Sequence, residues 1–240
     1  METVLLLTSC VTPSEENTRH FRNPEVRKQQ YLEALKYYLT KTYNTIVICD
    51  NSGYDFSTHF QDDTIHGRLE CLHYTEEYDA EKGLGFGERN IIAYALQHSA
   101  ALQYDCNIVK ITGRIIVDNL TTLLTTYNRT NPNETIFADI SLRSKKAWSI
   151  LFMAPKSFFM GPLLHRTNFI RISAGYSFES SLFDAIKDWK KQGHYFKQTA
   201  TPFYYRGFCA GSNQNYPENK GLKSRLITWY KSIVAERKLA

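Results

Sequence analysis

The first half of the chain alternates short apolar runs with longer segments of helical periodicity. Strands are expected over residues 4–8, 45–49, 68–73 and 106–111, and helices over residues 24–40 and 88–102. Strands separated by helices of this length are joined by right-handed crossovers, which make neighbouring strands parallel. The pattern therefore predicts an α/β fold with a mostly parallel central sheet flanked by helices.

Four polar or glycine-containing loops accompany the expected strands, over residues 8–12, 49–55, 81–90 and 110–114. Parallel sheets bind ligands beyond the carboxyl ends of their strands. Because these loops meet at one edge of the sheet, we expect them to form one ligand site.

The second half of the chain is less regular. It contains a strand-like run over residues 147–160, a turn followed by an amphipathic helix over 175–192, a loop rich in Gly, Ser and Asn over 207–219, and a helix over 220–239. With no internal repeat and no low-complexity linker, we expect one domain over residues 1–219. A basic amphipathic helix over residues 220–240 follows it.

The composition, with 42% hydrophobic and 22% charged residues, is that of a globular protein, and its 16 Tyr and 14 Phe favour a sheet-containing fold with stacking surfaces. The net charge of +5 is modest, and the cations are concentrated in a few places. This favours an anionic ligand or surface over duplex DNA, which calls for a more basic stripe. Nucleic acid is not an expected partner.

The five cysteines form no CxxC or CxH pair, and four of them lie within apolar strand-like runs. We interpret them as small buried hydrophobic residues in a reducing compartment. The first apolar run has no basic segment before it, so it does not resemble a signal peptide. No apolar run approaches the length of about 18 residues that a membrane span needs, and a cytoplasmic location is expected.

The stretch CDNSGYD, residues 49–55, ends a strand in Asp50 and continues with Asn51 and Ser52. The aspartate can accept hydrogen bonds from a base or ribose, and the turn exposes backbone donors. A plain Asx-turn that leaves a strand is the equally weighted alternative.

The stretch EKGLGFGE follows Lys82 with Gly83, Gly85 and Gly87 at every second position and then Glu88. Glycines allow the backbone to approach a ligand, and a helix start offers amide groups to an anion. The stretch matches neither a Walker loop nor a dinucleotide-binding fingerprint. A flexible turn is the alternative.

Together these pieces resemble a known family. TIVICDNSGYDFST resembles the strand and loop of GT-A fold glycosyltransferases, especially the large family 2 of inverting enzymes, and KGLGFGERNIIAYALQHS resembles their next landmark. The chain is closer still to bacterial glycosyltransferases of the capsule and O-antigen type, which share K-G-x-G-x-G-E, K-x-T-G-R and a late Gly-Ser loop. GFCAGSNQNY, residues 207–216, resembles that loop, and the likeness spans roughly residues 3–216.

In the family, the strand that corresponds to residues 106–111 ends in a D-x-D motif that holds a divalent metal on the diphosphate. Here it ends in KITGR, residues 110–114. The resemblance implies that Lys110 and Arg114 replace the metal in stabilising the diphosphate, with Thr112 and the Gly113 amide as further donors. No cofactor is expected, and a divalent metal, Mn or Mg, is the disfavoured alternative.

Asp79 and Glu81 have the acidic spacing of a D-x-D motif, but they precede the glycine stretch instead of following the fourth strand. We interpret them as a solvated turn. His165 and His194 have no partners at metal-ligand spacing and are interpreted as packing or surface residues.

An inverting enzyme of this fold needs a general base in its second half. Glu179, in GYSFESSLFDAI, resembles the acidic residue that supplies it, and the alternative is a first-turn glutamate that complements the helix dipole. Asp139, in FADISLR, is the second candidate. The cations that follow it, Arg143, Lys145 and Lys146, are interpreted as a solvated face, with phosphate or a charged acceptor as the alternative.

The resemblance implies a nucleotide-sugar half over residues 1–120 and an acceptor half over residues 121–219. The expected donor site consists of Thr8, Asp50, Asn51, Ser52, Lys82, Gly83, Gly85, Gly87, Glu88, Lys110, Thr112, Gly113, Arg114, Gly211 and Ser212. The expected activity is that of an inverting, metal-independent hexosyltransferase with a UDP-sugar donor and a carbohydrate or lipid-linked glycan acceptor. It would act in surface polysaccharide or glycan assembly.

Two other functions stay open. A nucleotidyltransferase that makes nucleotide sugars shares this sheet, but it usually carries a glycine- and basic-rich loop after its first strand, where LLLTSCVTPSEENTR has no glycine. A non-catalytic sugar or nucleotide-binding module is the other alternative, and it would not depend on Glu179.

The last helix carries Leu222, Leu226, Trp229 and Ile233 on one stripe and five cations elsewhere. Packing of this stripe on the domain is the favoured interpretation. Contact with an anionic membrane surface, where a lipid-linked acceptor would be presented, is the alternative.

Overall fold

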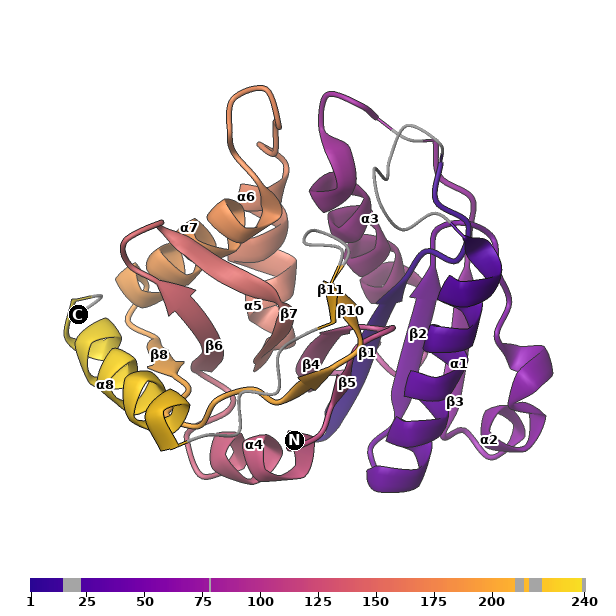
Figure 1. Cartoon of the computed structure of the whole chain (residues 1–240), viewed down its shortest axis with the longest axis horizontal. Helices are drawn as coiled ribbons and strands as arrows, with labels where there is room; N and C mark the ends of the chain where they lie inside the picture. The colour runs from indigo at the N-terminus through magenta and orange to yellow at the C-terminus, as the bar shows by residue number, and fades with distance from the viewer. Residues whose placement is uncertain (15–22, 78, 210–213, 216–221, 239–240) are drawn as a thin grey trace.

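The computed structural model describes residues 1–14, 23–77, 79–209, 214–215 and 222–238 (Figure 1). Its centre is a seven-stranded sheet with the strand order β3-β2-β1-β4-β7-β6-β8. The strands are β1 (Thr3–Ser9), β2 (Ile46–Asp50), β3 (Leu69–His73), β4 (Asn107–Thr112), β6 (Thr135–Ser141), β7 (Lys146–Pro155) and β8 (Tyr195–Gln198). Only β7 runs antiparallel to its neighbours, β4 and β6. The predicted α/β fold with a mostly parallel sheet is confirmed.

The central strand β1 shows why the sheet forms. Its run Val4 to Leu7 is fully buried, with even positions in one hydrophobic cluster and odd positions in the other. A strand that is apolar on both faces needs cover on both, which helices provide in parallel sheets.

Helices cover the two faces in pairs. Residues of α1 (Pro24–Lys41) and α4 (Leu120–Asn128) belong to one hydrophobic cluster, and residues of α3 (Gly83–His98) and α7 (Phe178–Lys191) belong to the other. Shorter helical segments are Ser57–His59, α2 (Gln61–Ile65), α5 (Lys156–Phe158), the π-helical turn Phe159–Leu163 and α6 (Leu164–Thr167). The last helix, α8 (Leu222–Lys238), lies beside β8 at the edge of the sheet (Figure 1).

The first helix begins where its sequence predicts. The Asn23 side chain accepts hydrogen bonds from the backbone N–H groups of Glu25 and Val26, at 3.0 and 3.3 Å. Pro24 occupies the first turn, where a missing N–H costs nothing, and Lys41 lies in the last turn, next to the negative end of the helix dipole.

Two predicted boundaries are wrong. Helix α3 begins at Gly83, so most of the loop expected over residues 81–90 is helical. Glycine has a low helix propensity, but here contacts decide: a Cβ at Gly85 would lie 3.0 Å from the Cβ of Phe178 on α7. The strand expected over residues 147–160 ends at Pro155, and helical turns follow it.

Several short elements were not predicted: α4, β6, β8, and the pairing of β5 (Ile116–Val117) with β9 (Tyr205–Arg206). A further pair, β10 (Phe208–Cys209) and β11 (Gln214–Asn215), follows β9. They bring the late part of the chain back to the segment after β4.

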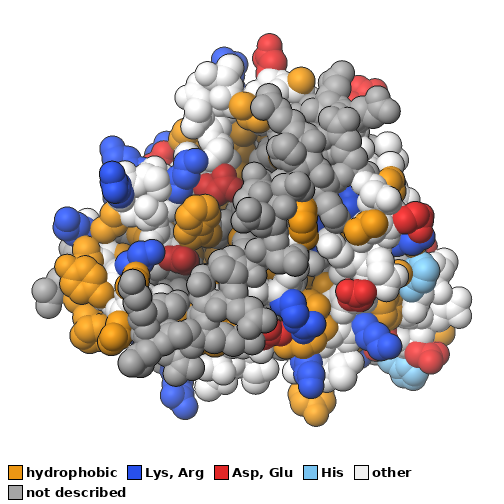
Figure 2. All heavy atoms as spheres, viewed as in Figure 1, with side chains coloured by type: hydrophobic (Ala, Val, Ile, Leu, Met, Phe, Trp, Pro, Cys, Tyr) orange, Lys and Arg blue, Asp and Glu red, His pale blue; other side chains and the backbone are white. Residues whose placement is uncertain are grey.

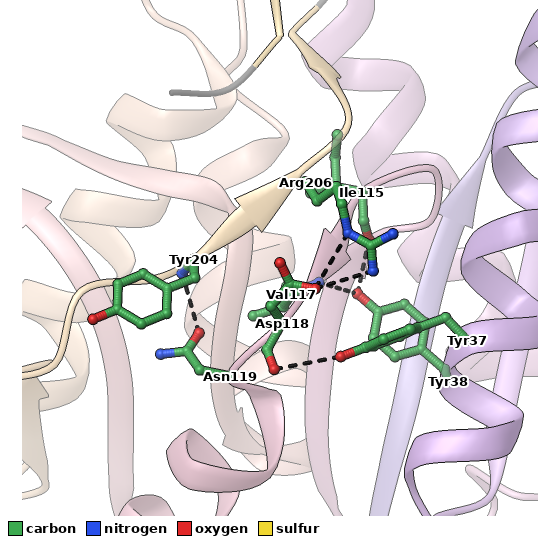
Figure 3. Close-up of polar contacts among 8 residues, drawn as sticks. All are labelled: Tyr37, Tyr38, Ile115, Val117, Asp118, Asn119, Tyr204 and Arg206. Atoms are coloured by element: carbon green, nitrogen blue, oxygen red, sulfur yellow. Dashed lines mark hydrogen bonds and ion pairs between the residues drawn. The ribbon is translucent and has the colours of Figure 1, made fainter. Parts of the chain in front are cut away.

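Side chains of α1 and of the segment after β5 hold this return in place (Figure 3). Arg206 pairs with Asp118 at 3.0 Å, and the side-chain oxygen Oδ1 of Asn119 accepts from the Tyr204 N–H at 3.1 Å. The Tyr38 hydroxyl donates to the Ile115 carbonyl at 2.7 Å and accepts from the backbone N–H of Val117 at 3.0 Å. The segment after β5 thus holds the return, and Tyr38 of α1 holds β5.

Within these ranges, Cys49 and Cys106 are buried free thiols, and Cys10 and Cys71 are half-buried ones. No helix of the described ranges combines the length and the apolar character needed to cross a membrane.

Candidate functional site

A pocket of about 310 Å³ opens at the carboxyl ends of β1, β2 and β3 and the first turns of α3. This is the sheet edge at which the loops were predicted to converge. Its lining residues are Cys10, Thr12, Pro13, Ser14, Asn51, Ser52, Thr75, Glu76, Glu77, Asp79, Gly83, Phe86 and Gly87. Four predicted donor-site residues are therefore in its wall: Asn51, Ser52, Gly83 and Gly87.

Asp50 has a different position from the one predicted. It is fully buried, and its carboxylate accepts five hydrogen bonds from protein groups. The donors are Ser9 Oγ (3.0 Å), the Val11 N–H (3.0 Å), the Ser52 N–H (2.7 Å), Ser52 Oγ (2.6 Å) and the Tyr54 N–H (3.1 Å). Asp50 thus joins the loops after β1 and β2. It therefore supports the loops that line the pocket, and its carboxylate is not exposed to a nucleoside.

Glu76 is a pocket residue that the sequence analysis missed. Its carboxylate accepts from Asn51 Nδ2 at 2.9 Å, from the Tyr74 hydroxyl at 3.2 Å and from the Asn90 amide. A Cβ at Gly87 would lie 3.4 Å from Asn51 Nδ2, so this glycine allows α3 to approach the network. No sequence pattern marks Glu76, since its partners come from β2, β3 and α3.

Asp79 and Glu81, interpreted as a solvated turn, lie at the start of α3. Asp79 accepts from the N–H groups of Glu81 and Lys82 and pairs with the Lys82 ammonium at 3.1 Å. The hydrogen bond from Lys82 is the main factor that lowers the pKa of Asp79. Among the described residues, no group of three His, Cys, Asp or Glu side chains is placed to hold a metal ion.

Lys110 was predicted to contact a diphosphate, but it is buried. Its side chain is 0% exposed, and its ammonium donates to the Glu88 carboxylate, the Ser149 carbonyl (2.7 Å) and Thr112 Oγ1 (3.4 Å). An ammonium has three N–H bonds, and all three have protein acceptors. The prediction that Lys110 contacts a diphosphate is therefore wrong, because its charge is paired inside the protein.

Glu88 lies between the pocket and the end of β4. Its Oε1 accepts from Lys110 and, at 3.4 Å, from the hydroxyl of Thr8, and no hydrogen bond to Oε2 is found among the described residues. The side chain is 19% exposed, which agrees with a carboxylate held at one oxygen and presented at the other. Thr8, Glu88, Lys110 and Thr112, all predicted site residues, thus form one cluster.

Ser149 connects this cluster to Glu179. Its backbone carbonyl accepts from Lys110, and its hydroxyl donates to Glu179 Oε1 at 3.2 Å. Ser177, the N-cap of α7, donates from its hydroxyl to Glu179 Oε2 at 2.8 Å. A continuous hydrogen-bonded chain therefore runs from Thr8 to Glu179. We call it the junction network, made of Thr8, Glu88, Lys110, Ser149, Ser177 and Glu179.

Arg114 lies beyond the end of β4 and is half-buried. Its guanidinium donates to the Phe208 carbonyl of β10. Burial raises the pKa of the Tyr31 hydroxyl, and the charges of Arg27 and Arg114 oppose that rise, so both cations lie near this hydroxyl. Arg27, which the sequence analysis missed, donates to the Cys10 carbonyl at 2.8 and 2.6 Å.

Gly113 is needed for close packing and not as a donor. Its N–H donates to the Thr8 carbonyl at 2.9 Å, and a Cβ at this position would lie 2.9 Å from the same oxygen. The expectation that its amide contacts a diphosphate is therefore wrong.

Asp139 is not brought to this cluster. It lies on β6 at the point where the register with β7 shifts, between Ala138 and Ile140. It accepts from Gln198 Nε2 at 2.5 Å, and burial raises its pKa. Gly211 and Ser212 lie outside the described residues.

The remaining predicted surface residues lie away from the pocket lining. Arg143 and Lys145 are exposed in the turn between β6 and β7. His194 stacks on Trp189 with 3.8 Å between ring centroids, and His165 contacts Phe169 edge-on. Both histidines thus make packing contacts.

No protein-family model matches the chain, and no curated protein sequence matches it. Solved structures do. The chain is similar to a glycosyltransferase involved in the glycosylation of the major capsid of PBCV-1, with 13% identity, 84% of this chain and 83% of that chain covered, and a TM-score of 0.49. It is also similar to a putative nucleotide-diphospho-sugar transferase from Desulfovibrio desulfuricans G20, with 11% identity, 100% and 99% covered, and a TM-score of 0.49.

A third similar structure is the glycosyltransferase GlyE of Streptococcus pneumoniae TIGR4, with 11% identity and a TM-score of 0.50. The match covers 82% of this chain and 45% of that one. At such identities the likeness concerns the fold alone, which is GT-A-like.

Proposed function

We propose that the chain is a glycosyltransferase that moves a sugar from a nucleotide donor to a carbohydrate acceptor. The observation that carries the proposal is the adjacency of two features at one edge of the sheet. A pocket of about 310 Å³ lies at the ends of β1–β3, and the junction network beside it ends in the carboxylate of Glu179. A transferase of this kind needs such a nucleotide pocket and a base on the acceptor side.

In this proposal the nucleoside lies in the pocket, between the loops that Asp50 joins and the first turns of α3. Asn51, Ser52 and Glu76 offer hydrogen-bond partners to it, and Phe86 offers an aromatic face. Uridine is the proposed nucleoside. The Oε2 atom of Glu88 accepts from a hydroxyl of the donor sugar.

The diphosphate extends from the pocket towards the end of β4, where Arg114 lies. Arg114 stabilises the charge that develops on the leaving group, because a guanidinium binds phosphate oxygens through two parallel N–H bonds. This cation supports the metal-independent form of the proposal, because the resembled family has acidic residues at the same strand end. Arg27, next to the same tyrosine hydroxyl, adds to the positive potential.

Glu179 acts as the general base. It takes the proton of an acceptor hydroxyl while that oxygen forms a bond to the anomeric carbon and the bond to the diphosphate breaks. A single displacement of this kind inverts the configuration at the anomeric carbon. The hydroxyls of Ser149 and Ser177 hold the two carboxylate oxygens, so the base has a fixed orientation before the acceptor binds.

Lys110 is a positioning residue in this scheme. Its buried ion pair with Glu88 ties β4 to α3, and its bond to the Ser149 carbonyl ties β4 to β7. The donor side and the base therefore keep one relative position.

The test is turnover of UDP-, GDP- and CDP-sugars with oligosaccharide and lipid-linked acceptors, with release of nucleoside diphosphate as the readout and with EDTA in a parallel series. Release of UDP that persists in EDTA and requires an acceptor is the expected result. Release of pyrophosphate from a nucleoside triphosphate and a sugar 1-phosphate would instead show a nucleotidyltransferase. Binding of UDP-sugars with no product in either assay would show a binding module, and both outcomes contradict the proposal.

A further inference from the structure

The last helix, α8, presents large hydrophobic side chains to solvent. Leu226, Ile227, Trp229 and Tyr230 are 57%, 47%, 55% and 65% exposed. These four residues lie within five consecutive positions, 226–230. Among the described residues, the only other tryptophan with a comparably exposed side chain is Trp148. We call these four residues the α8 apolar face.

The helix is docked on the domain through its other side. Ser232 and Ala235 are 6% and 3% exposed, and Ala235 belongs to the hydrophobic cluster shared by α3 and α7. With 100° of rotation per residue, Leu226 and Tyr230 point roughly opposite to these two. The favoured expectation, that the apolar stripe packs on the domain, therefore fails for Leu226 and Trp229.

The segment that carries the α8 apolar face has an excess of positive charge in its sequence. Residues 220–240 contain one acid, Glu236, and six cations: Lys220, Lys223, Arg225, Lys231, Arg237 and Lys238. Lys231 and Lys238 are exposed. Figure 2 shows hydrophobic side chains together with Lys and Arg side chains at the side of the molecule where α8 lies.

We propose that the α8 apolar face docks on the surface of an anionic membrane. Tryptophan and tyrosine favour the level of the lipid headgroups, where the ring is buried and its polar atom stays hydrated. Cations beside such a face gain attraction from anionic headgroups. The charge also argues against a second copy of the chain, because a symmetric contact would bring the same cations together.

The inference depends on α8 alone and not on the proposed transferase activity. Its consequence is that α8 would hold the protein at the interface where lipid-linked molecules are found. The binding would be peripheral, salt-sensitive and reversible, since one interfacial helix anchors far more weakly than a membrane span.

The experiment is co-sedimentation of the whole chain with vesicles of phosphatidylcholine alone and of phosphatidylcholine mixed with phosphatidylglycerol, at low and high salt. Binding is expected only to the mixed vesicles and is expected to weaken with salt. The variant Trp229→Ser/Tyr230→Ser should bind roughly tenfold more weakly. Its matched control is Tyr43→Ser/Tyr104→Ser, which removes two aromatic side chains that are 97% and 80% exposed elsewhere and should bind as the wild type does.

A second variant, Lys231→Glu/Lys238→Glu, keeps the α8 apolar face and reverses the charge at two positions. It should also lose binding, whereas Lys36→Glu/Lys187→Glu, which changes two exposed lysines on α1 and α7, should weaken it less. Circular dichroism establishes that each variant is folded. Three results would overturn the proposal: no binding to the mixed vesicles, equal binding by the wild type and both α8 variants, or a dimer on gel filtration that Trp229→Ser/Tyr230→Ser dissociates.

Discussion

Two regions of the site are held together in different ways. In the pocket, the carboxylate of Asp50 receives N–H groups from Ser52 and Tyr54, which lie within four residues of it, and from Val11 on the neighbouring loop. In the junction network, the ammonium of Lys110 joins residues far apart in sequence: 22 positions separate it from the Glu88 carboxylate, and 39 separate it from the Ser149 backbone carbonyl.

This difference has a functional meaning. The pocket is built from two adjoining loops whose backbone a buried carboxylate fixes, so its shape should persist when the junction is altered. The junction sets the position of α3 and α7 relative to β4, and with it the position of Glu179 relative to the donor. Substitutions can therefore separate nucleotide binding from transfer.

The largest effect is expected from Glu179→Gln, which keeps the shape of the side chain and removes the base. Transfer should fall about 10²- to 10⁴-fold, as is typical for the loss of a general base. The affinity for the nucleotide should not change, because the pocket lining does not include Glu179. Rate and affinity are measured on the same preparation.

The matched control is Glu33→Gln, an exposed carboxylate on α1. It should transfer at the wild-type rate. Equal rates for Glu179→Gln and Glu33→Gln would mean that another group deprotonates the acceptor.

Lys110→Met tests whether the buried lysine is structural. It leaves the Glu88 carboxylate without its partner, and the free energy of unfolding should fall by about 3–5 kcal/mol. Adding Glu88→Gln should recover about 1–2 kcal/mol, because no unpaired charge then remains. Urea unfolding measures both values.

Lys197→Met, on the exposed side of β8, is the control and should be nearly neutral. If Lys110→Met proved as stable as this control, the ion pair would contribute nothing to the fold, and the assignment of Lys110 as a positioning residue would be wrong.

Asp50→Ala removes the common acceptor of the two pocket loops. Several N–H and O–H groups lose their partner, and the free energy of unfolding should fall by about 2–4 kcal/mol, with weaker nucleotide binding. Asp105→Ala, at an exposed aspartate before β4, controls for the loss of one negative charge. Unchanged stability of Asp50→Ala would show that the loops do not need this carboxylate.

The smallest effect is expected at the contact between α3 and α7. In Gly85→Ala the new Cβ meets Phe178 Cβ at 3.0 Å and its N at 3.1 Å, so the helices must separate. This should cost about 1–3 kcal/mol and reduce transfer. Gly161→Ala, where no atom lies within 4 Å of the new Cβ, should be neutral. Equal stability of the two variants would contradict close packing at Gly85.

The same difference explains how much could be predicted. The strands β1–β4, the helix α1 and the convergence of loops at one edge follow from apolar runs and caps that lie next to each other in the sequence. The sequence also marked most members of the cluster, including Glu88 and Glu179. Thr8 lies near the end of β1 and Glu179 in the first turn of α7, where local pattern carries information. Glu88 and Lys110 were marked by the resemblance to family motifs.

What could not be predicted depends on tertiary contact. Local pattern does not show that Lys110 faces the interior. Burying its charge is unfavourable unless the carboxylate of Glu88, from another element, pairs with it. Ser149 and Glu76 have no local signature, since their partners come from other elements. The glycines of α3 looked like a loop because their helix is stabilised by contacts with Phe178 and Asn51 and not by propensity.

In the proposed mechanism the charge at the end of β4 is divided: Lys110 is paired inside the protein, and Arg114 contacts the diphosphate. Isothermal titration with UDP tests it most directly, in EDTA and in manganese, on the wild type, Arg114→Ala and Lys110→Met/Glu88→Gln. Binding should persist in EDTA, weaken about 10- to 100-fold in Arg114→Ala and survive in the double variant. Binding that requires manganese and tolerates Arg114→Ala would contradict it.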